Sequence, residues 1–193
     1  MTLRCEGCGE VVAASAVAPV PFRCPNAGTD DADHLLVPVF DPERTAFPED
    51  PGQGSPFVDF RSLLHAYALA RTHSLSDDRF VDLVERLDTA VAEVDWTGFR
   101  STPFGPLPAL GEALRFKGNG AVWVKDDTAN VGGSHKARHL MGILLHLEVV
   151  EALGWGPAPR LAIASCGNAA LAAAVVARAA ERPLRVFIPT SAD

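Results

Sequence analysis

Apolar positions in the second half of the chain alternate between strand-like runs and helix-like spacing. Short apolar runs at 121–125, 160–165 and 184–188 are typical of buried strands. Between them, apolar residues recur at helical spacing over 136–153 and 168–181. This order predicts an α/β fold, in which the three strands form a parallel sheet with flanking helices and right-handed crossovers.

The first half of the chain has a different pattern. Residues 57–72 carry the apolar stripe of one amphipathic helix, and Ser76 followed by two acidic residues predicts the start of another. Residues 41–56 contain four prolines and two glycines, which indicates a linker. His65 and His73 lie in the helical region. Isolated histidines at such positions usually pack or face solvent, so neither is given a role.

These patterns divide the chain into four parts: a cysteine-bearing segment (1–40), a linker (41–56), a helical region (57–100) and an α/β part (101–193). The net charge of −7 disfavours nucleic acid and anionic membranes as partners. Neither a membrane-spanning apolar run nor a signal-peptide pattern is seen. We therefore expect a cytoplasmic protein, whose cysteines stay reduced or bind metal.

The first 40 residues contain a tight Cys5-x-x-Cys8-Gly9 turn, followed by Cys24-Pro25. This spacing resembles the zinc ribbon that precedes some threonine synthase-like enzymes. Ala27 stands where such a ribbon has its fourth cysteine, and a closed structural zinc site needs four ligands. His34 is close enough in sequence to complete a Cys3His set with Cys5, Cys8 and Cys24. The alternative is a decayed ribbon that binds no metal. A redox role is disfavoured, because no βαβ pattern surrounds the cysteines.

The stretch 122–138 is the centre of the α/β part. A strand-like run ends in two acidic residues, and a turn with Gly132-Gly133 then leads through Ser134 and His135 to Lys136 and a helix. A lysine in the first turn of a helix opposes the helix dipole, and such broken local rules tend to mark functional sites. Only three lysines occur in the chain, namely Lys117, Lys125 and Lys136.

Two blocks in this part carry a resemblance to a known family. The block Lys125-Asp126-Asp127…Asn130-x-x-Gly133-Ser134-x-Lys136-x-Arg138 resembles the cofactor-lysine segment of fold type II pyridoxal-phosphate (PLP) enzymes, the tryptophan synthase β superfamily. Its threonine synthase branch is the most similar. The block Ser165-Cys166-Gly167-Asn168-Ala169-Ala170 resembles the asparagine loop of the same enzymes. The two blocks are in family order, and the resemblance covers residues 101–193.

The resemblance implies roles for particular residues. Lys136 would be the catalytic lysine that binds PLP covalently, shielded from water by the glycine loop, and Asn168 would contact the ring hydroxyl of the cofactor. Ser165, Gly167 and Asn168 would hold the substrate carboxylate through backbone N–H groups, as helix starts do. Both residues also have a purely structural interpretation, in which Lys136 is a solvated lysine after a turn and Asn168 is a helix cap. His135 stands where the family has phenylalanine, so the resemblance does not identify the substrate.

The resemblance implies a PLP-dependent lyase or synthase of amino-acid metabolism, threonine synthase-like or else serine/threonine dehydratase-like. Its partner would be a small-molecule amino-acid substrate, with a homodimer as a candidate assembly. The family's phosphate loop lies beyond the asparagine loop, so we expect these 193 residues to be the N-terminal portion of such an enzyme, or a shortened relative, with weak cofactor binding alone. The other hypothesis is a non-catalytic zinc-ribbon protein with a truncated α/β domain.

Overall fold

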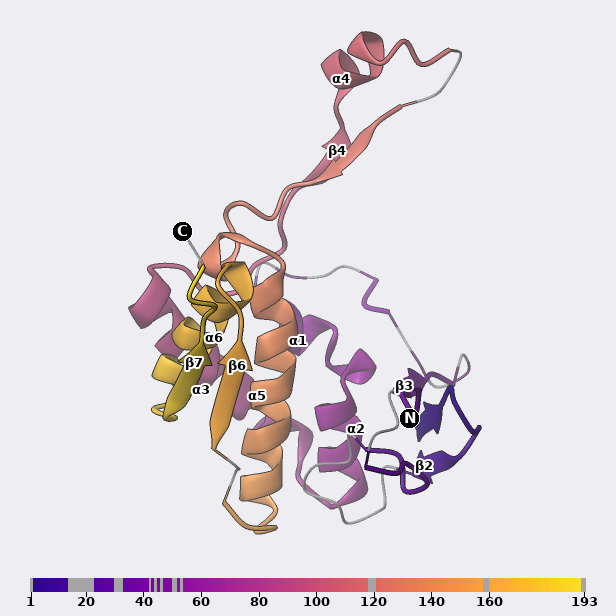
Figure 1. Cartoon of the computed structure of the whole chain (residues 1–193), viewed down its shortest axis with the longest axis vertical. Coiled ribbons are helices and arrows are strands. Elements are labelled where there is room, and N and C mark those ends of the chain that lie inside the picture. The colour runs from indigo at the N-terminus through magenta and orange to yellow at the C-terminus, as the bar shows by residue number, and fades with distance from the viewer. Residues whose placement is uncertain are drawn as a thin grey trace.

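The computed structural model describes residues 2–13, 23–29, 33–41, 43, 45, 47–49, 52, 54–117, 121–157 and 160–191. Figure 1 shows a body of helices with two strands on one side, a small sheet beside it, and an arm that projects away from it. Parts of the 1–40 segment and of the 41–56 linker, and residues 118–120 of the turn after Lys117, lie outside the described residues.

The helical region departs from its prediction at one point. The expected single helix over 57–72 is wrong, because this segment forms α1 (Pro56–Asp59), the 3-10 helix η1 (Arg61–Leu63) and α2 (His65–Thr72). Leu64 adopts an extended backbone with ψ of 131°, which ends the regular helix before α2 begins. The next helix, α3 (Asp77–Asp95), begins as predicted, with Ser76 accepting a hydrogen bond from the Arg79 N–H.

The α/β part contains the predicted helices and a parallel pair of strands. β6 (Leu161–Ala164) pairs in parallel with β7 (Leu184–Phe187), and α6 (Asn168–Ala179) connects them. The helix before them, α5 (Lys136–Ala152), begins at the predicted residue. These elements make the chain a mixed α/β protein, as the alternating pattern predicts.

The third predicted parallel strand is wrong. β5 (Trp123–Lys125) pairs antiparallel with β4 (Phe104–Pro106), and the two form a separate sheet in the projecting arm, with α4 (Pro108–Ala113) near its tip (Figure 1). Pro103 and Pro106 keep that segment extended, so it is available to pair with the nearby run after the turn. Strand pairing between sequence neighbours costs less loop entropy than pairing with β6.

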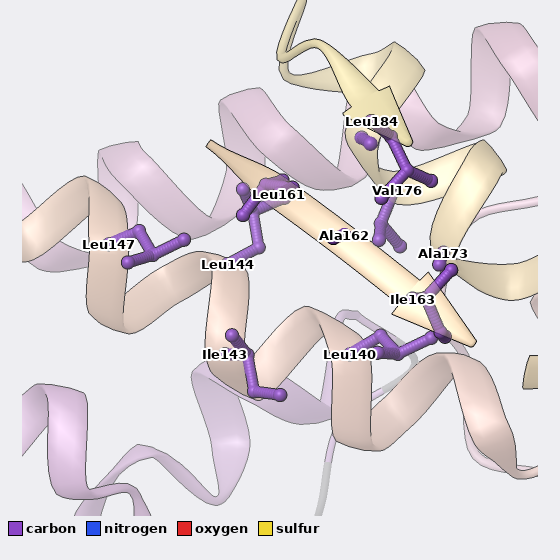
Figure 2. Close-up of a pocket in the computed structure, with 11 residues that line it drawn as sticks. Leu140, Ile143, Leu144, Leu147, Leu161, Ala162, Ile163, Ala173, Val176 and Leu184 are labelled. Atoms are coloured by element: carbon purple, nitrogen blue, oxygen red, sulfur yellow. The ribbon is translucent and has the colours of Figure 1, made fainter. Parts of the chain in front are cut away.

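Apolar side chains of α5 face the two parallel strands and α6. Figure 2 shows Leu140 and Leu144 of α5 beside Ile163 and Leu161 of β6, with Val176 of α6 on the other side. They line an apolar cavity of about 120 Å³. Most of the buried core lies instead between α2, α3, α5 and α6. Among the described residues, no helix is both long enough and apolar enough to cross a membrane.

The N-terminal segment forms its own small sheet. Its three strands are β1 (Thr2–Cys5), β2 (Val11–Ala13) and β3 (Leu36–Val39), with β1 in the middle and antiparallel to both neighbours. Pro38 lies in the edge strand β3, where a missing backbone N–H is tolerated. Only Leu3, Cys5 and Cys24 are buried among the apolar residues described in this segment, so it has little core of its own.

Two histidines stack between α2 and α5. The ring centroids of His65 and His146 are 5.7 Å apart with an interplanar angle of 25°. Both ring nitrogens of His65 are buried and have no hydrogen-bond partner in the described part of the chain. Burial, and then the neighbouring positive charge of His146, lower the pKa of His65 from 6.5 to about 4.

This low pKa predicts a loss of stability in mild acid. The unfolded chain binds a proton on His65 below about pH 6.5 and the folded chain does not, so stability is complete above pH 6.5 and falls as the pH falls toward 4. After a discount for partial exposure, we expect the free energy of unfolding to drop by about 1 kcal/mol between pH 7 and pH 5. Urea unfolding of His65→Phe should show a smaller drop. His73→Phe, at the other end of α2, should behave like wild type, and equal pH dependence in all three proteins would contradict the assignment.

Candidate functional site

A glycine loop precedes the helix that carries Lys136. The loop, η2 (Val131–Gly133), includes Gly132 with a φ of 63°, in the left-handed region that favours glycine. The Gly132 N–H donates to Asp95 Oδ2 at 2.9 Å, which ties the loop to the end of α3. On its other side the loop lies against α6, where a Cβ on Gly132 would meet Ala172 Cα at 3.4 Å. The loop is therefore fixed between two helices.

Polar contacts then lead from this loop into α5. The buried Asn130 donates from Nδ2 to the Ser134 carbonyl at 2.6 Å, which closes the turn around the two glycines. Ser134 does not occupy the N-cap position of α5, which belongs to His135, but its Oγ accepts the Lys136 N–H at 3.4 Å. These contacts fix the backbone from which the Lys136 side chain extends.

A second set of contacts connects the arm to the first turn of α5. Asp127 accepts hydrogen bonds from the Thr102 hydroxyl at 2.5 Å and from Arg138 Nη2 at 3.3 Å. The Thr102 hydroxyl, and then Arg138, hold the pKa of Asp127 below its ordinary value. Arg138 thus acts as a charge partner of Asp127, and the same Nη2 group contacts Thr102 and the Arg100 carbonyl, 36 and 38 residues earlier in the chain.

Lys136 is exposed in the structure, so the expectation that the glycine loop shields it from water is wrong. The loop packs against α3 and α6 and leaves the lysine side chain uncovered. No described residue makes a hydrogen bond or ion pair with its Nζ. Lys125 differs, because its Nζ donates to the Thr102 carbonyl at 2.5 Å.

The segment 165–168 forms the turn between β6 and α6. Asn168 is the first residue of α6 and Gly167 its N-cap, and no side chain caps this helix. Ser165 extends the parallel ladder through its N–H to the Phe187 carbonyl, and its hydroxyl accepts the Gly167 N–H at 3.3 Å. Figure 1 shows the starts of α5 and α6 at the same end of the body, where β6 and β7 end. Within the described ranges, no hydrogen bond joins this turn to Lys136.

The residues at this end fit PLP, which carries an aldehyde, an aromatic ring and a phosphate. A lysine with an uncommitted amine supplies the attachment point. The uncapped start of α6 leaves backbone N–H groups for an anion. A Cβ on Gly167 would meet nothing within 4 Å, so there is room beside the turn. Asn130 Oδ1 is buried and accepts no hydrogen bond from the described residues, which leaves one unused acceptor in the glycine loop.

The N-terminal sheet brings together the four predicted metal ligands. One ligand atom each from Cys5, Cys8, Cys24 and His34 lies within 4.8 Å of all the others. Cys5 Sγ is 3.5 Å from His34 Nδ1, and Cys8 Sγ is 3.6 Å from Cys24 Sγ. All three cysteines are free thiols. Three sulfurs and one imidazole at these separations suit a tetrahedral zinc ion.

Neighbouring groups hold this cluster in place. The turn after Cys5 approaches the segment before His34 so closely that a Cβ on Gly7 would lie 2.5 Å from the Asp33 carbonyl oxygen. Hydrogen bonds from the Glu10 backbone and from Asn26 lower the pKa of Cys8 to about 7, which favours the thiolate that metals bind. Burial raises the pKa of Cys24 to about 11, so metal binding at this thiol requires proton release.

Sequence reasoning missed three residues that fix the cofactor-side geometry. Asp95 is at the end of a helix 37 residues before its partner Gly132, and no local pattern marks it. The Thr102 hydroxyl donates to Asp127, 25 residues later in the chain, and no local pattern marks this contact. Asn130 was quoted in the motif without a role, and its position four residues before Ser134 is the signal of a closed turn.

Residues 96–193 match the family described as "Pyridoxal-phosphate dependent enzyme". This range contains the glycine loop, Lys136, the 165–168 turn and both parallel strands. It begins after α3 and leaves out the cysteine cluster. No curated protein and no solved structure matches the chain.

The glycine loop supports a first test of this geometry. Replacement of Gly132 by alanine should lower the free energy of unfolding by about 1–2 kcal/mol, because a φ of 63° is costly for a residue with a Cβ. The matched control is Gly142→Ala in the middle of α5, where a Cβ meets nothing within 4 Å. That change should raise the free energy of unfolding by about 0.5–1 kcal/mol. Urea titration measures both, and a neutral Gly132→Ala would show that the loop is not held as described.

Proposed function

The chain belongs to the pyridoxal-phosphate dependent enzyme family, and from this premise we propose that it serves an enzyme that acts on an amino acid by elimination or replacement. The observation that carries the proposal is the arrangement around Lys136. A fixed glycine loop presents this lysine at the start of α5, at the same end of the body as the uncapped start of α6. We also propose that the protein is cytoplasmic.

In this proposal each residue has a limited task. Lys136 would hold the cofactor through Nζ and would move protons at the substrate carbon. Asn168 would contact the cofactor ring, and its N–H at the uncapped start of α6 would bind the substrate carboxylate. The Ser165 and Gly167 N–H groups, which the resemblance also assigned to the carboxylate, already donate to the Phe187 carbonyl and the Ser165 hydroxyl. PLP, when bound, supplies the electron sink that stabilises negative charge on the substrate. Asp95 and Asn130 only position the loop, since they contact backbone groups.

The finer proposal is a threonine synthase-like reaction, supported by the likeness of both motif blocks to that branch and by the cysteine cluster ahead of them. A serine/threonine dehydratase-like reaction is the competing candidate. The two differ in product: a dehydratase releases a 2-oxo acid and ammonia from serine or threonine, whereas a synthase forms threonine from an amino acid with a leaving group on Cγ. Product analysis on the two substrate types therefore separates them.

The cofactor bond is tested directly by chemical labelling. Protein incubated with saturating PLP and reduced with borohydride should carry the label on Lys136, because its amine is exposed and uncommitted while Lys125 is bonded to Thr102. Peptide mapping by mass spectrometry gives the position. Lys136→Ala should lose the label, and the matched controls Lys117→Arg and Lys125→Arg should keep it. Label mainly on Lys117 or Lys125 would refute the assignment.

We also propose that the N-terminal segment binds one structural zinc ion through Cys5, Cys8, Cys24 and His34. The closeness of the four ligand atoms supports this proposal, as does the small core of the segment. Small domains with little core commonly depend on a metal for stability. The alternative of a decayed ribbon would need no such convergence of three thiols and an imidazole.

Zinc content tests the metal proposal. Protein purified without chelator should contain about one zinc per chain, and Cys8→Ser should lose most of it, because removing one of four ligands opens the site. Cys166→Ser is the matched control, since Cys166 is an exposed free thiol outside the cluster. Elemental analysis of the three proteins gives the answer. Zinc-free wild-type protein, or equal zinc in wild type and Cys8→Ser, would contradict the proposal.

A further inference from the structure

The three cysteines of the N-terminal segment differ in how far they are exposed. Cys8 is exposed to solvent, whereas Cys5 and Cys24 are buried. Cys8 Sγ and Cys24 Sγ are 3.6 Å apart, and both thiols are free. One sulfur of this pair can therefore be reached from solvent, while its neighbour is shielded.

We propose that Cys8 and Cys24 form an oxidisable pair, in which a peroxide oxidises Cys8 and Cys24 then closes a disulfide with it. Such a bond would remove two of the four ligands of the proposed zinc site and release the metal. The release of zinc rests on the zinc proposal made above, whereas the thiol chemistry does not. The reaction is stoichiometric, so it differs from thioredoxin-like catalysis, which the lack of a βαβ pattern around the cysteines disfavours.

The surroundings of Cys8 favour its reaction with a peroxide. The rate of such an oxidation follows the exposure of the sulfur and its thiolate character. Asn26 Nδ2 donates a hydrogen bond to Cys8 Sγ at 3.6 Å, which stabilises the thiolate over the thiol. Cys166 is also exposed, but it is outside the cluster, and the other three cysteines all lie in the first 40 residues. Cys8 is thus the exposed thiol that has a second thiol beside it.

Cys24 suits the second step better than Cys5 does. Cys5 belongs to β1, the central strand of the small sheet, and its Sγ is 3.5 Å from His34 Nδ1. Cys8 lies in the turn after β1, and Cys24 begins a turn that the Ala27 N–H closes. Since neither residue is held by a strand ladder, a local shift can close the gap of 3.6 Å to the disulfide bond length of about 2.0 Å.

The two steps balance with hydrogen peroxide as the oxidant. The Cys8 sulfur attacks one peroxide oxygen, the O–O bond breaks, and a sulfenic acid and one water form. The Cys24 sulfur then attacks the Cys8 sulfur, the S–O bond breaks, and a second water leaves. Peroxide is reduced to two waters while two thiols are oxidised to a disulfide. Starting from two zinc-bound thiolates, the same reaction takes up two protons from solvent and frees Zn²⁺.

The disulfide has a structural consequence for the segment. Cys5 and His34 alone would leave zinc with half of its protein ligands, too few for a closed structural site. Because the segment has little core of its own, loss of the metal also removes a source of its stability. Oxidation would therefore make the order of this segment depend on redox conditions.

Peptide mapping tests the pair directly. Full-length protein purified without chelator is treated with hydrogen peroxide, blocked with N-ethylmaleimide and digested with trypsin without reduction. Trypsin separates Cys24, in peptide 24–44, from Cys5 and Cys8, in peptide 5–23. We expect the two peptides to be joined, with the maleimide on Cys5. A colorimetric zinc indicator should report about one zinc released per disulfide, and dithiothreitol should reverse both changes.

Three variants identify the order of the steps. In Cys24→Ser the sulfenic acid has no resolving thiol, so dimedone, which traps sulfenic acids, should label Cys8 strongly, whereas the wild type should show little label. In Cys8→Ser peroxide should leave the two peptides unjoined. Cys166→Ser is the matched control and should form the disulfide and release zinc like the wild type. The mapping in the wild type does not depend on how well either of the first two variants folds.

The outcomes of this test separate the two proposals. The oxidisable pair is overturned if peroxide forms no disulfide, if it joins Cys5 to either of the other two cysteines instead, or if zinc stays bound after the disulfide forms. Wild-type protein without zinc would contradict the zinc proposal alone, because the disulfide can be mapped in metal-free protein as well. Bound zinc without any disulfide after peroxide would contradict only the pair.

Discussion

The contact between the glycine loop and α6 is the constraint on which the rest of the α/β part depends. Gly132 lies so near Ala172 that only a methyl group could be added at Gly132. The Gly132 N–H also donates a hydrogen bond to Asp95 at the end of α3. Three helices therefore meet at one backbone segment. Since α5 begins three residues after that segment, the place and direction of Lys136 follow from how well these helices pack. The position of Lys136 therefore depends on helix packing as well as on the residues of its motif.

The N-terminal segment differs from the α/β part in what can stabilise it. A three-stranded sheet with a few buried side chains gains little from the hydrophobic effect, so it needs another source of order. The convergence of Cys5, Cys8, Cys24 and His34 supplies one if metal is bound. This segment also forms one wall of a pocket of about 420 Å³ through Leu3 and Leu36, and His65 of α2 and His146 of α5 line the same pocket. Order in the metal-binding segment and the shape of that pocket are consequently linked.

Sequence reasoning succeeded where the determinants are local. The starts of α5 at Lys136 and of α6 at Asn168 were predicted to the residue, because a turn followed by helical apolar spacing is a local signal. The closeness of Cys5, Cys8, Cys24 and His34 was also expected, from the resemblance of their spacing to a zinc ribbon. Sequence reasoning failed where residues far away in the sequence determine the local structure. Strand β5 pairs with β4 rather than with β6, and the break at Leu64 reflects tertiary packing that overrides the apolar stripe of 57–72.

The arm has a consequence for how the molecule opens. Its ladder consists of three residue pairs, its Phe104 and Trp123 rings are more than half exposed, and it contributes little to the core, so it belongs to the least stable part of the fold. At its base, however, the hydrogen bonds among Thr102, Asp127 and Arg138 tie both chains of the arm to α5. Local unfolding that starts at the tip therefore meets a barrier at the base. Opening of the tip can therefore occur without loss of α5, as long as the hydrogen bonds at the base are kept.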